Sequence, residues 1–252
     1  MSLKPGIILR AAWAELLDLV YPGLCHGCGS GLSGERSLCD GCVGELPGLK
    51  EPYCRQCGEE FPGRISGDFE CPNCQGLTFA FEFARPAVPN HPVILEMIHQ
   101  LKYRRRIELG AELGRVAALA FEDDPRLATA LEGGWPLVPV PLHRDRQRWR
   151  YFNQAEEIAR PIASRTGLPL CAALERIRRT GSQTRLSRAQ RLKNLKGAFS
   201  MSRAGLALAA GKPPGVVLVD DVFTTGATSD ECARVLCKAG VQKVVVVTVM
   251  RG

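Results

Sequence analysis

The sequence predicts an α/β protein with a parallel sheet, preceded by a small cysteine-rich module. Two apolar runs, residues 216–219 and 244–249, are continuous and rich in valine, which is typical of strands buried on both faces. A Thr/Gly turn and a helical segment near residues 229–239 follow the first run, in the order of an α/β unit. Together with four C-x-x-C pairs before residue 75, these patterns divide the chain into 1–22, 23–77 and 78–252.

The composition is that of a globular protein with an anionic partner. The chain has 252 residues, of which 45% are hydrophobic and 23% are charged, and its net charge is +7. Positive charge favours either a phosphorylated small molecule or a nucleic acid. Composition alone does not separate these two classes of partner.

Residues 7–20 are predicted to form an amphipathic helix that packs on the rest of the protein. The apolar side chains recur at helical spacing, and they are Leu9, Trp13, Leu16, Leu17 and Val20. Arg10, Glu15 and Asp18 interrupt the segment, so we expect no stable membrane insertion, although a helix on a membrane surface is an alternative. With no cleavage site and with paired cysteines, a cytoplasmic location is expected.

The paired cysteines predict two structural Zn²⁺ ions. Each C-x-x-C turn directs two thiolates at one ion, and two such turns complete a tetrahedral four-thiolate site. The linker-like residues 47–52 favour sequential pairing. The expected ligands are Cys25, Cys28, Cys39 and Cys42 for the first ion, and Cys54, Cys57, Cys71 and Cys74 for the second.

Other interpretations of the cysteines fit less well. The spacing alone also permits a cross-braced arrangement, with the first pair sharing an ion with the third. A redox role needs a βαβ context that this segment lacks, and the pairs do not have iron–sulfur spacing.

Between the cysteines and the valine-rich strands the sequence alternates ordered and basic segments. We expect a strand in 78–89, a helix over 92–120 interrupted by a basic cluster, a proline-broken strand at 137–142, and a helix over 154–166. The alternating arginines of 144–150 predict a loop that is disordered by self-repulsion unless an anion gathers it. The polar, basic run 176–196 is typical of a lid over a charged ligand.

The segment after the first valine-rich strand predicts a sugar-phosphate site. Asp220 and Asp221 stand where the strand ends, and the carboxyl ends of parallel strands form the ligand crevice of an open α/β sheet. Carboxylates there suit sugar hydroxyls or a metal ion. A helix N-terminus and small residues suit a phosphate, and the residues concerned are Thr224, Thr225, Gly226, Ala227 and Thr228.

This segment resembles the phosphoribosyl pyrophosphate (PRPP) motif of type I phosphoribosyltransferases, without a gap. Over nearly the whole chain, the order of motifs resembles the ComF family, in which a double zinc ribbon precedes a phosphoribosyltransferase domain. The matching segments are 19–22, 101–103, 138–143, 152–156, 179–180, Gln183, 186–187, Arg191, Asn194, 197–199 and the PRPP motif. The family usually has glycine in place of Tyr151, and another in the cluster occupied by Arg105 and Arg106.

The resemblance implies a parallel-sheet type I phosphoribosyltransferase fold, PRPP as ligand, and Mg²⁺ bridging its pyrophosphate to its ribose. Asp220 and Asp221 would hold the ribose at the catalytic centre, and the loop to Thr228 would hold the 5′-phosphate. Val140, Pro141 and His143 would belong to the pyrophosphate loop, with Arg179 and Arg191 as anion contacts of the flexible loop. His143 is either a general acid or base or a structural, phosphate-contacting residue.

Three functions remain open from the sequence. The first is a PRPP-binding protein, expected to be a phosphoribosyltransferase in DNA uptake or nucleotide metabolism. The second is a non-catalytic accessory protein of the competence machinery that binds single-stranded DNA beside a helicase-like partner, with Lys102, Arg104, Arg144 and Arg148 as candidate contacts. The third is a scaffold without activity. Related folds often dimerise, so a homodimer is one expected assembly.

Overall fold

The computed structural model describes residues 23–34, 36–61, 63, 70–179 and 195–252, and the chain divides into two compact units, Met1–Leu46 and Pro47–Gly252. The helix expected over 7–20 and the predicted site residue Arg191 lie outside the described residues. The boundary expected near residue 77 stays a prediction. The unit that begins at Pro47 includes the second pair of cysteine turns.

The first unit is a small ribbon. β1 (Gly23–Leu24) pairs antiparallel with β2 (Gly31–Leu32), and the short helix α2 (Asp40–Gly44) follows. The backbone N–H of Gly29 donates to the carbonyl of Cys25, which closes the first turn, and Gly29 has the positive φ that such a turn requires. The Sγ of Cys39 accepts a hydrogen bond from the N–H of Cys42 and so caps α2.

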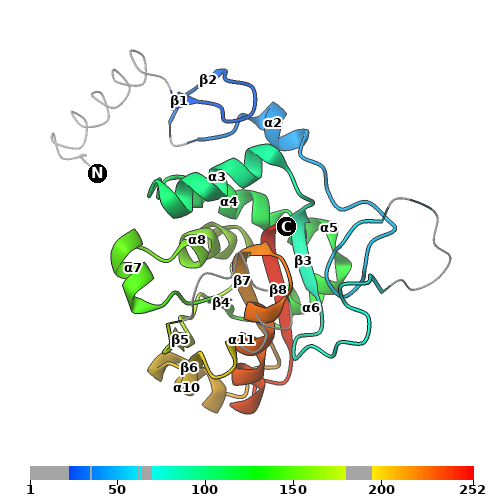
Figure 1. Ribbon diagram of the computed structural model, residues 1–252, viewed down its shortest axis with the longest axis vertical. Coiled ribbons are helices and arrows are strands. Elements are labelled where there is room, and N and C mark those ends of the chain that lie inside the picture. Colours follow the sequence, from blue (N-terminus) through cyan, green and yellow to red (C-terminus); the bar gives the residue numbers. More distant parts are fainter. Residues whose placement is uncertain (1–22, 35, 62, 64–69, 180–194) are drawn as a thin grey trace, which may run out of the picture. The chain divides into compact units, whose positions relative to one another are not determined.

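The second unit is built on a four-stranded parallel sheet of order β3-β8-β7-β4 (Figure 1). The strands are β3 (Ala84–Val88), β8 (Val244–Arg251), β7 (Val216–Phe223) and β4 (Leu137–Pro139), and every neighbouring pair is parallel. A separate antiparallel pair joins β5 (Leu174–Arg176) to β6 (Phe199–Met201). The predicted α/β class with a parallel sheet is confirmed.

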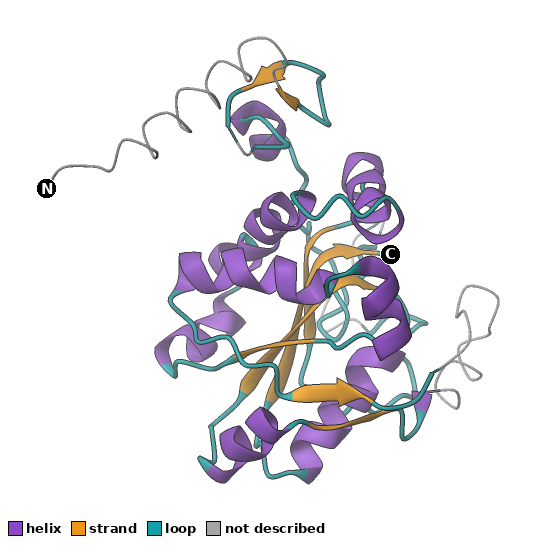
Figure 2. Cartoon of the chain, turned by 90° about the vertical axis from the view of Figure 1, so that its left-hand side faces the viewer, coloured by secondary structure: helices purple, strands orange, loops and turns teal. Residues whose placement is uncertain are grey.

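Helices cover the sheet on both sides (Figure 2). α4 (Leu109–Ala118) and α8 (Gln154–Thr166) pack on each other and on the central strands. α11 (Ala227–Lys238) packs with β6 and β8, and α3 (Pro92–Tyr103) packs on α4. The other helices among the described residues are α5 (Ala120–Asp123), a 3₁₀ turn (Pro125–Leu127), α6 (Ala128–Glu132), α7 (Arg144–Arg150) and α10 (Arg203–Ala210).

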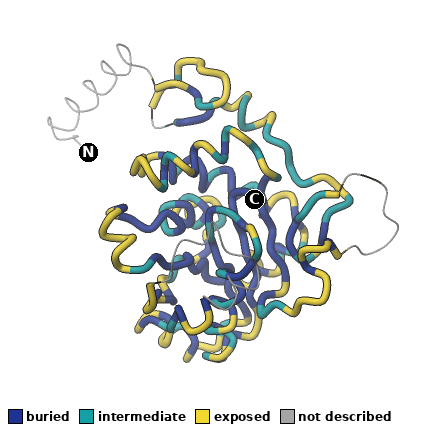
Figure 3. Tube along the Cα trace, viewed as in Figure 1, coloured by how far each residue is buried: buried dark blue, intermediate teal, exposed yellow. Residues whose placement is uncertain are grey.

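One core unites the sheet, α11 and the second group of cysteines. Successive side chains of a strand point to opposite faces, and Val216 and Leu218 of β7 share this core with Cys232 and Leu236 of α11. The buried Cys54, Cys57, Cys71 and Cys74 belong to the same cluster. Figure 3 shows the strands as an almost continuous buried band. The second ribbon is therefore part of the hydrophobic core of the sheet.

The helix expected over 92–120 is interrupted at the basic cluster as predicted, since it ends at Tyr103 and resumes at Leu109. The elements differ from the sequence prediction in two places. The strand expected over 78–89 forms as β3 only from Ala84. The expectation that the arginines of 144–150 are disordered without an anion is wrong, because they form α7. His143 caps this helix by accepting from the N–H of Asp145, and the Arg150 side chain is buried against α8, where Nη1 donates to Gln154.

Candidate functional site

A cleft of about 570 Å³ opens at the carboxyl ends of β7 and β4, which is where ligands bind open parallel sheets. Its volume lies within the range of small-molecule sites, about 300–1,000 Å³. Residues from several elements line it, and they are Lys102, Tyr103, Val140, Pro141, Leu142, Arg146, Trp149, Arg150, Gln154, Arg176, Asp220, Asp221, Val222, Thr224 and Thr228.

The two adjacent carboxylates lie in the carboxyl-terminal half of β7, and one of them is paired with a lysine. The Nζ of Lys102, from the last turn of α3, is 2.5 Å from Oδ2 of Asp221, and both side chains are largely buried. Oδ1 of Asp221 accepts from the N–H of Val222, and Oδ1 of Asp220 accepts from the N–H of Asp221. The pair is thus held in place by the backbone and by one ammonium group.

The other carboxyl group, that of Asp220, has an unusually high pKa. Burial, together with the neighbouring charge of Asp221, raises the pKa of Asp220 to about 7. Lys102 acts in the opposite direction but does not cancel these two effects. A cation delivered to this end of the cleft would favour the ionised form.

The turn into α11 is shaped for a close backbone approach. Gly226 is the N-cap of α11 with a φ of 75°, and a Cβ there would lie 2.8 Å from Cζ of Phe223. Only glycine combines that conformation with that contact. Thr224 and Thr228 face the cleft, whereas Gly226 and Ala227 are buried in the turn. The arrangement presents hydroxyls and a helix N-terminus to an anion.

Two buried arginines that the sequence analysis did not single out also line the cleft. Arg150, at the end of α7, and Arg176, in β5, are both less than a tenth exposed. Burial lowers the pKa of each guanidinium, and both remain protonated because arginine starts so high. Within the described part of the chain, Nε of Arg150 has no hydrogen-bond partner. These groups give the cleft fixed positive charge.

The cysteines form two four-thiol groups within the described residues. In each group the sulfur atoms lie within 4.8 Å of one another, and the groups are Cys25, Cys28, Cys39 and Cys42, and Cys54, Cys57, Cys71 and Cys74. The grouping is sequential and not cross-braced. Four thiols at this separation fit a tetrahedral Zn²⁺ ion. The second group is fully buried, whereas Cys28 of the first is exposed.

Comparison with known proteins identifies the family. Residues 16–75 match the double zinc ribbon domain family. The chain is 31% identical to competence protein F of Haemophilus influenzae over 215 residues, which cover 83% of this chain and 88% of that protein. It is 32% identical to DNA utilization protein YhgH of Escherichia coli K12, with 88% and 94% covered, and 32% identical to that of Salmonella typhimurium with the same coverage. The chain belongs to the ComF family.

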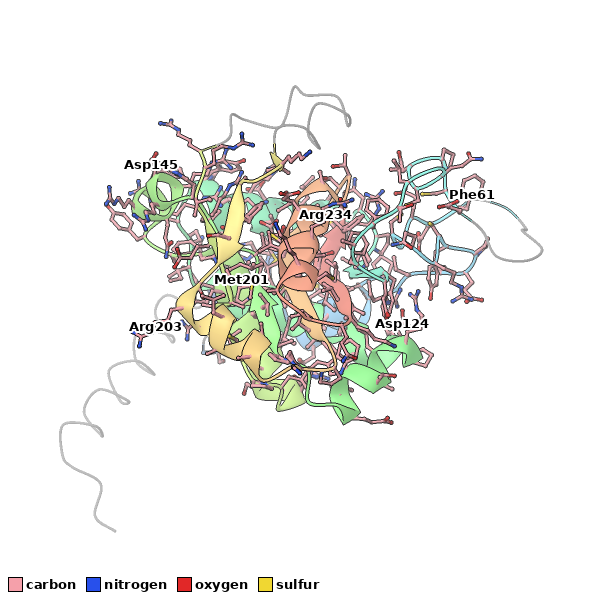
Figure 4. The ribbon with its side chains drawn as sticks, turned by 90° about the horizontal axis from the view of Figure 1, so that it is seen from below. Phe61, Asp124, Asp145, Met201, Arg203 and Arg234 are labelled. Carbon is pink, nitrogen blue, oxygen red and sulfur yellow. The ribbon has the colours of Figure 1, made fainter. Side chains whose placement is uncertain are left out.

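The structure places the other predicted residues of this ComF-family chain around the cleft. Val140 and Pro141 line it. His143 instead faces an adjoining pocket of about 540 Å³ that shares Pro141, Leu142 and Arg176 with the cleft. Arg179 is exposed, with Nη1 3.7 Å from Oδ2 of Asp145 on α7, which is labelled in Figure 4.

The predicted nucleic-acid contacts separate into two places. Arg104, Arg144 and Arg148 are exposed, as a backbone contact requires. Lys102 is different because it points into the cleft and pairs with Asp221. Lys102 lies next to the basic cluster in the sequence, so no local pattern reveals this role. Only the packing of α3 brings Lys102 to Asp221. Among the described residues, no helix is both long enough and apolar enough to cross a bilayer.

Proposed function

We propose that this ComF-family protein binds PRPP, through its ribose 5-phosphate moiety and with Mg²⁺, in the cleft at the end of β7. The observation that carries the proposal is the meeting of Asp220 and Asp221 with Thr224 and Thr228 in one cleft at the carboxyl ends of parallel strands. The carboxylates would accept from the ribose hydroxyls, and the turn would donate to the 5′-phosphate. The ungapped PRPP motif supports the same assignment.

The chemistry of the donors fits Mg²⁺. Hard carboxylate oxygens are its preferred protein ligands, and Asp220 and Asp221 supply them. Lys102 pairs with Asp221, so the negative charge left for a cation is that of Asp220 in its ionised form. When bound, Mg²⁺ supplies charge neutralisation of the pyrophosphate. The residues that would hold it are Asp220 and Asp221.

In a transfer reaction, the protein's own groups would act by orientation and charge. Departure of pyrophosphate from the anomeric carbon places negative charge on the leaving oxygen, and preorganised cations stabilise it. Arg176, buried between the cleft and the adjoining pocket of His143, is in place for this role. Arg150 would supply positive charge at the ribose end of the cleft, because its guanidinium interacts electrostatically with the carboxylates of Asp221 and Asp220.

We propose that the biological setting is DNA uptake or DNA utilization. The support is the family itself, because relatives covering most of the chain are named competence protein F and DNA utilization protein.

Calorimetry with PRPP and Mg²⁺ tests the ligand. We expect Asp220→Asn with Asp221→Asn to weaken binding at least about 100-fold, since two charged hydrogen-bond acceptors are lost. Glu122→Gln is the matched control, because Glu122 is an exposed carboxylate paired with Arg165 on another part of the surface. Equal binding by the double variant and the wild type would contradict the proposal.

A second candidate function is the binding of single-stranded DNA without catalysis. The exposed Arg104, Arg144 and Arg148 favour it. Phosphate contacts release counterions, so the logarithm of the binding constant should fall linearly with the logarithm of salt concentration. The triple substitution of these arginines by glutamine should flatten that slope. Binding that ignores salt would rule out this candidate.

A further inference from the structure

An exposed cluster of aromatic and cationic side chains stands at the rim of the cleft. Trp149, near the end of α7, is 48% exposed and lines the same cleft as Asp220 and Thr228. Tyr151, two residues later, is 78% exposed. The guanidinium of Arg105 lies 4.9 Å from the ring centroid of each. Large exposed aromatic rings beside a cavity are the usual sign of a ligand surface.

The cluster is held in a backbone conformation that costs free energy. Arg105 has a φ of 58° and Tyr151 a φ of 72°, which is the left-handed region that ordinarily favours glycine. Arg105 follows α3, whereas Tyr151 caps α7, so two separate loops take the unfavourable conformation and bring these two side chains into contact. Strain of this kind is retained where a particular side-chain arrangement is needed.

We propose that Trp149, held by Arg105 and Tyr151, is a stacking platform for the planar ring of a nucleobase. This inference rests on the proposed function for the position of the ribose, which would occupy the end of the cleft at Asp220 and Thr228. The lining of the same cleft also includes Trp149 and Tyr103, both aromatic, and the apolar Leu142. A planar ring on the anomeric carbon, or one that is to be joined to it, would therefore contact the aromatic faces of these side chains.

The charges around the platform agree with such an occupant. Arg146 lines the cleft, and the exposed Arg144 and Arg148 lie on the same helix as Trp149. Guanidinium groups attract phosphates, while the indole face accepts any base, because every base has a π-face. A base of a free nucleotide and a base of a single strand share this chemistry.

The decisive experiment compares two probes that differ by the base alone, on the full-length zinc-loaded protein. Adenosine 5′-monophosphate contains both the ribose 5-phosphate and the base, whereas ribose 5-phosphate lacks the base. We expect the wild type to bind adenosine 5′-monophosphate about 10-fold more tightly, a typical contribution of one stacked base. Trp149→Ala should remove that advantage and leave the affinity for ribose 5-phosphate unchanged, while Trp149→Phe should retain most of it.

A second variant separates positioning from folding. Arg105→Gly relieves the unfavourable φ, so its thermal midpoint should stay at or above that of the wild type. Its preference for adenosine 5′-monophosphate over ribose 5-phosphate should nevertheless fall by about 3-fold, because the indole loses the cation that holds it. A merely structural role predicts no change in this preference.

The outcomes separate the platform from the proposed function. If ribose 5-phosphate binds but the base adds nothing, or if Trp149→Ala weakens both probes equally, the platform is wrong and the ribose site stands. If ribose 5-phosphate fails to bind the wild type, the proposed function is wrong. A single-stranded oligodeoxythymidylate then decides, since binding that needs Trp149 but not Asp220 supports a platform for bases of a strand, and binding that ignores Trp149 overturns it.

Discussion

Asp220 and Asp221 are adjacent in sequence, yet the fold gives them different surroundings. Asp221 pairs with Lys102 of α3, whereas the pKa of Asp220 is raised to about 7 by burial and by the charge of Asp221. The ligand-free site therefore holds one carboxylate in a stable ion pair and keeps the other sensitive to cations and pH.

The raised pKa predicts a pH-dependent stability change. An unfolded aspartate titrates near 3.9, so the folded state of the ligand-free protein loses stability through Asp220 as pH rises from about 4 to about 7. Asp220→Asn removes this loss. We expect the variant to gain about 2–3 kcal/mol more over the wild type at about pH 8 than at about pH 5. Urea unfolding of both proteins at the two pH values measures it, and an equal difference would contradict the assigned pKa.

Gly226 yields a second prediction for a single residue. Alanine at a φ of 75°, with its Cβ 2.8 Å from Cζ of Phe223, should cost about 2 kcal/mol of stability. It should also weaken phosphate binding, because the turn must move. Chemical denaturation measures the first effect and calorimetry with inorganic phosphate the second. Gly48→Ala is the control, since its Cβ would meet Asp123 at an ordinary 3.6 Å.

Residues of the site differ in how visible they are in the sequence. The run from Asp220 to Thr228 is contiguous, so a local pattern reveals it. Lys102, Arg150 and Arg176 come from α3, α7 and β5, and only the packing of these elements brings them into the cleft. No local pattern distinguishes them from the solvated arginines beside them.

Among the secondary-structure elements, α7 shows why the alternating arginines led to a wrong prediction of disorder. Arg144 and Arg148 are exposed to solvent, where water screens their repulsion. Arg150 is buried and donates a hydrogen bond to Gln154. His143 at the N-cap and Asp145 in the first turn favour the helix start. The valine-rich strands and α8 were predictable because their patterns reflect burial, which a sequence records directly.

The contact of α4 with α8 makes a third prediction. A Cβ at Gly114 of α4 would lie 2.4 Å from the carbonyl oxygen of Ile158 in α8. Gly114→Ala should therefore separate the helices and destabilise the unit by about 1–3 kcal/mol. Thermal unfolding followed by circular dichroism measures it, and a stability within error of the wild type would show that the helices pack less closely.

For the whole molecule, the two cysteine groups predict two rates of zinc loss. The first group is partly exposed and sits in a small ribbon, whereas the second is buried in the core with the sheet. A chelator should remove about half of the zinc quickly, and the rest only as the second unit unfolds. A colorimetric zinc indicator follows both phases.

Serine variants of the two groups identify the phases. Cys42→Ser should abolish the fast phase and leave the unfolding of the second unit unchanged. Cys71→Ser should abolish the slow phase and destabilise the sheet by several kcal/mol, on the order of a lost structural ion. A single phase in the wild type would contradict the assignment of one group to the core.

The shared core of the second ribbon and the sheet has a consequence for the living cell. Because the four buried thiols belong to the same cluster as Val216 and Leu218, a chain synthesised without zinc lacks part of its interior as well as a surface module. Cellular proteases degrade chains that fail to form their hydrophobic core. We expect the abundance of this protein to follow the supply of zinc during growth, so that metal nutrition would regulate the amount of folded protein.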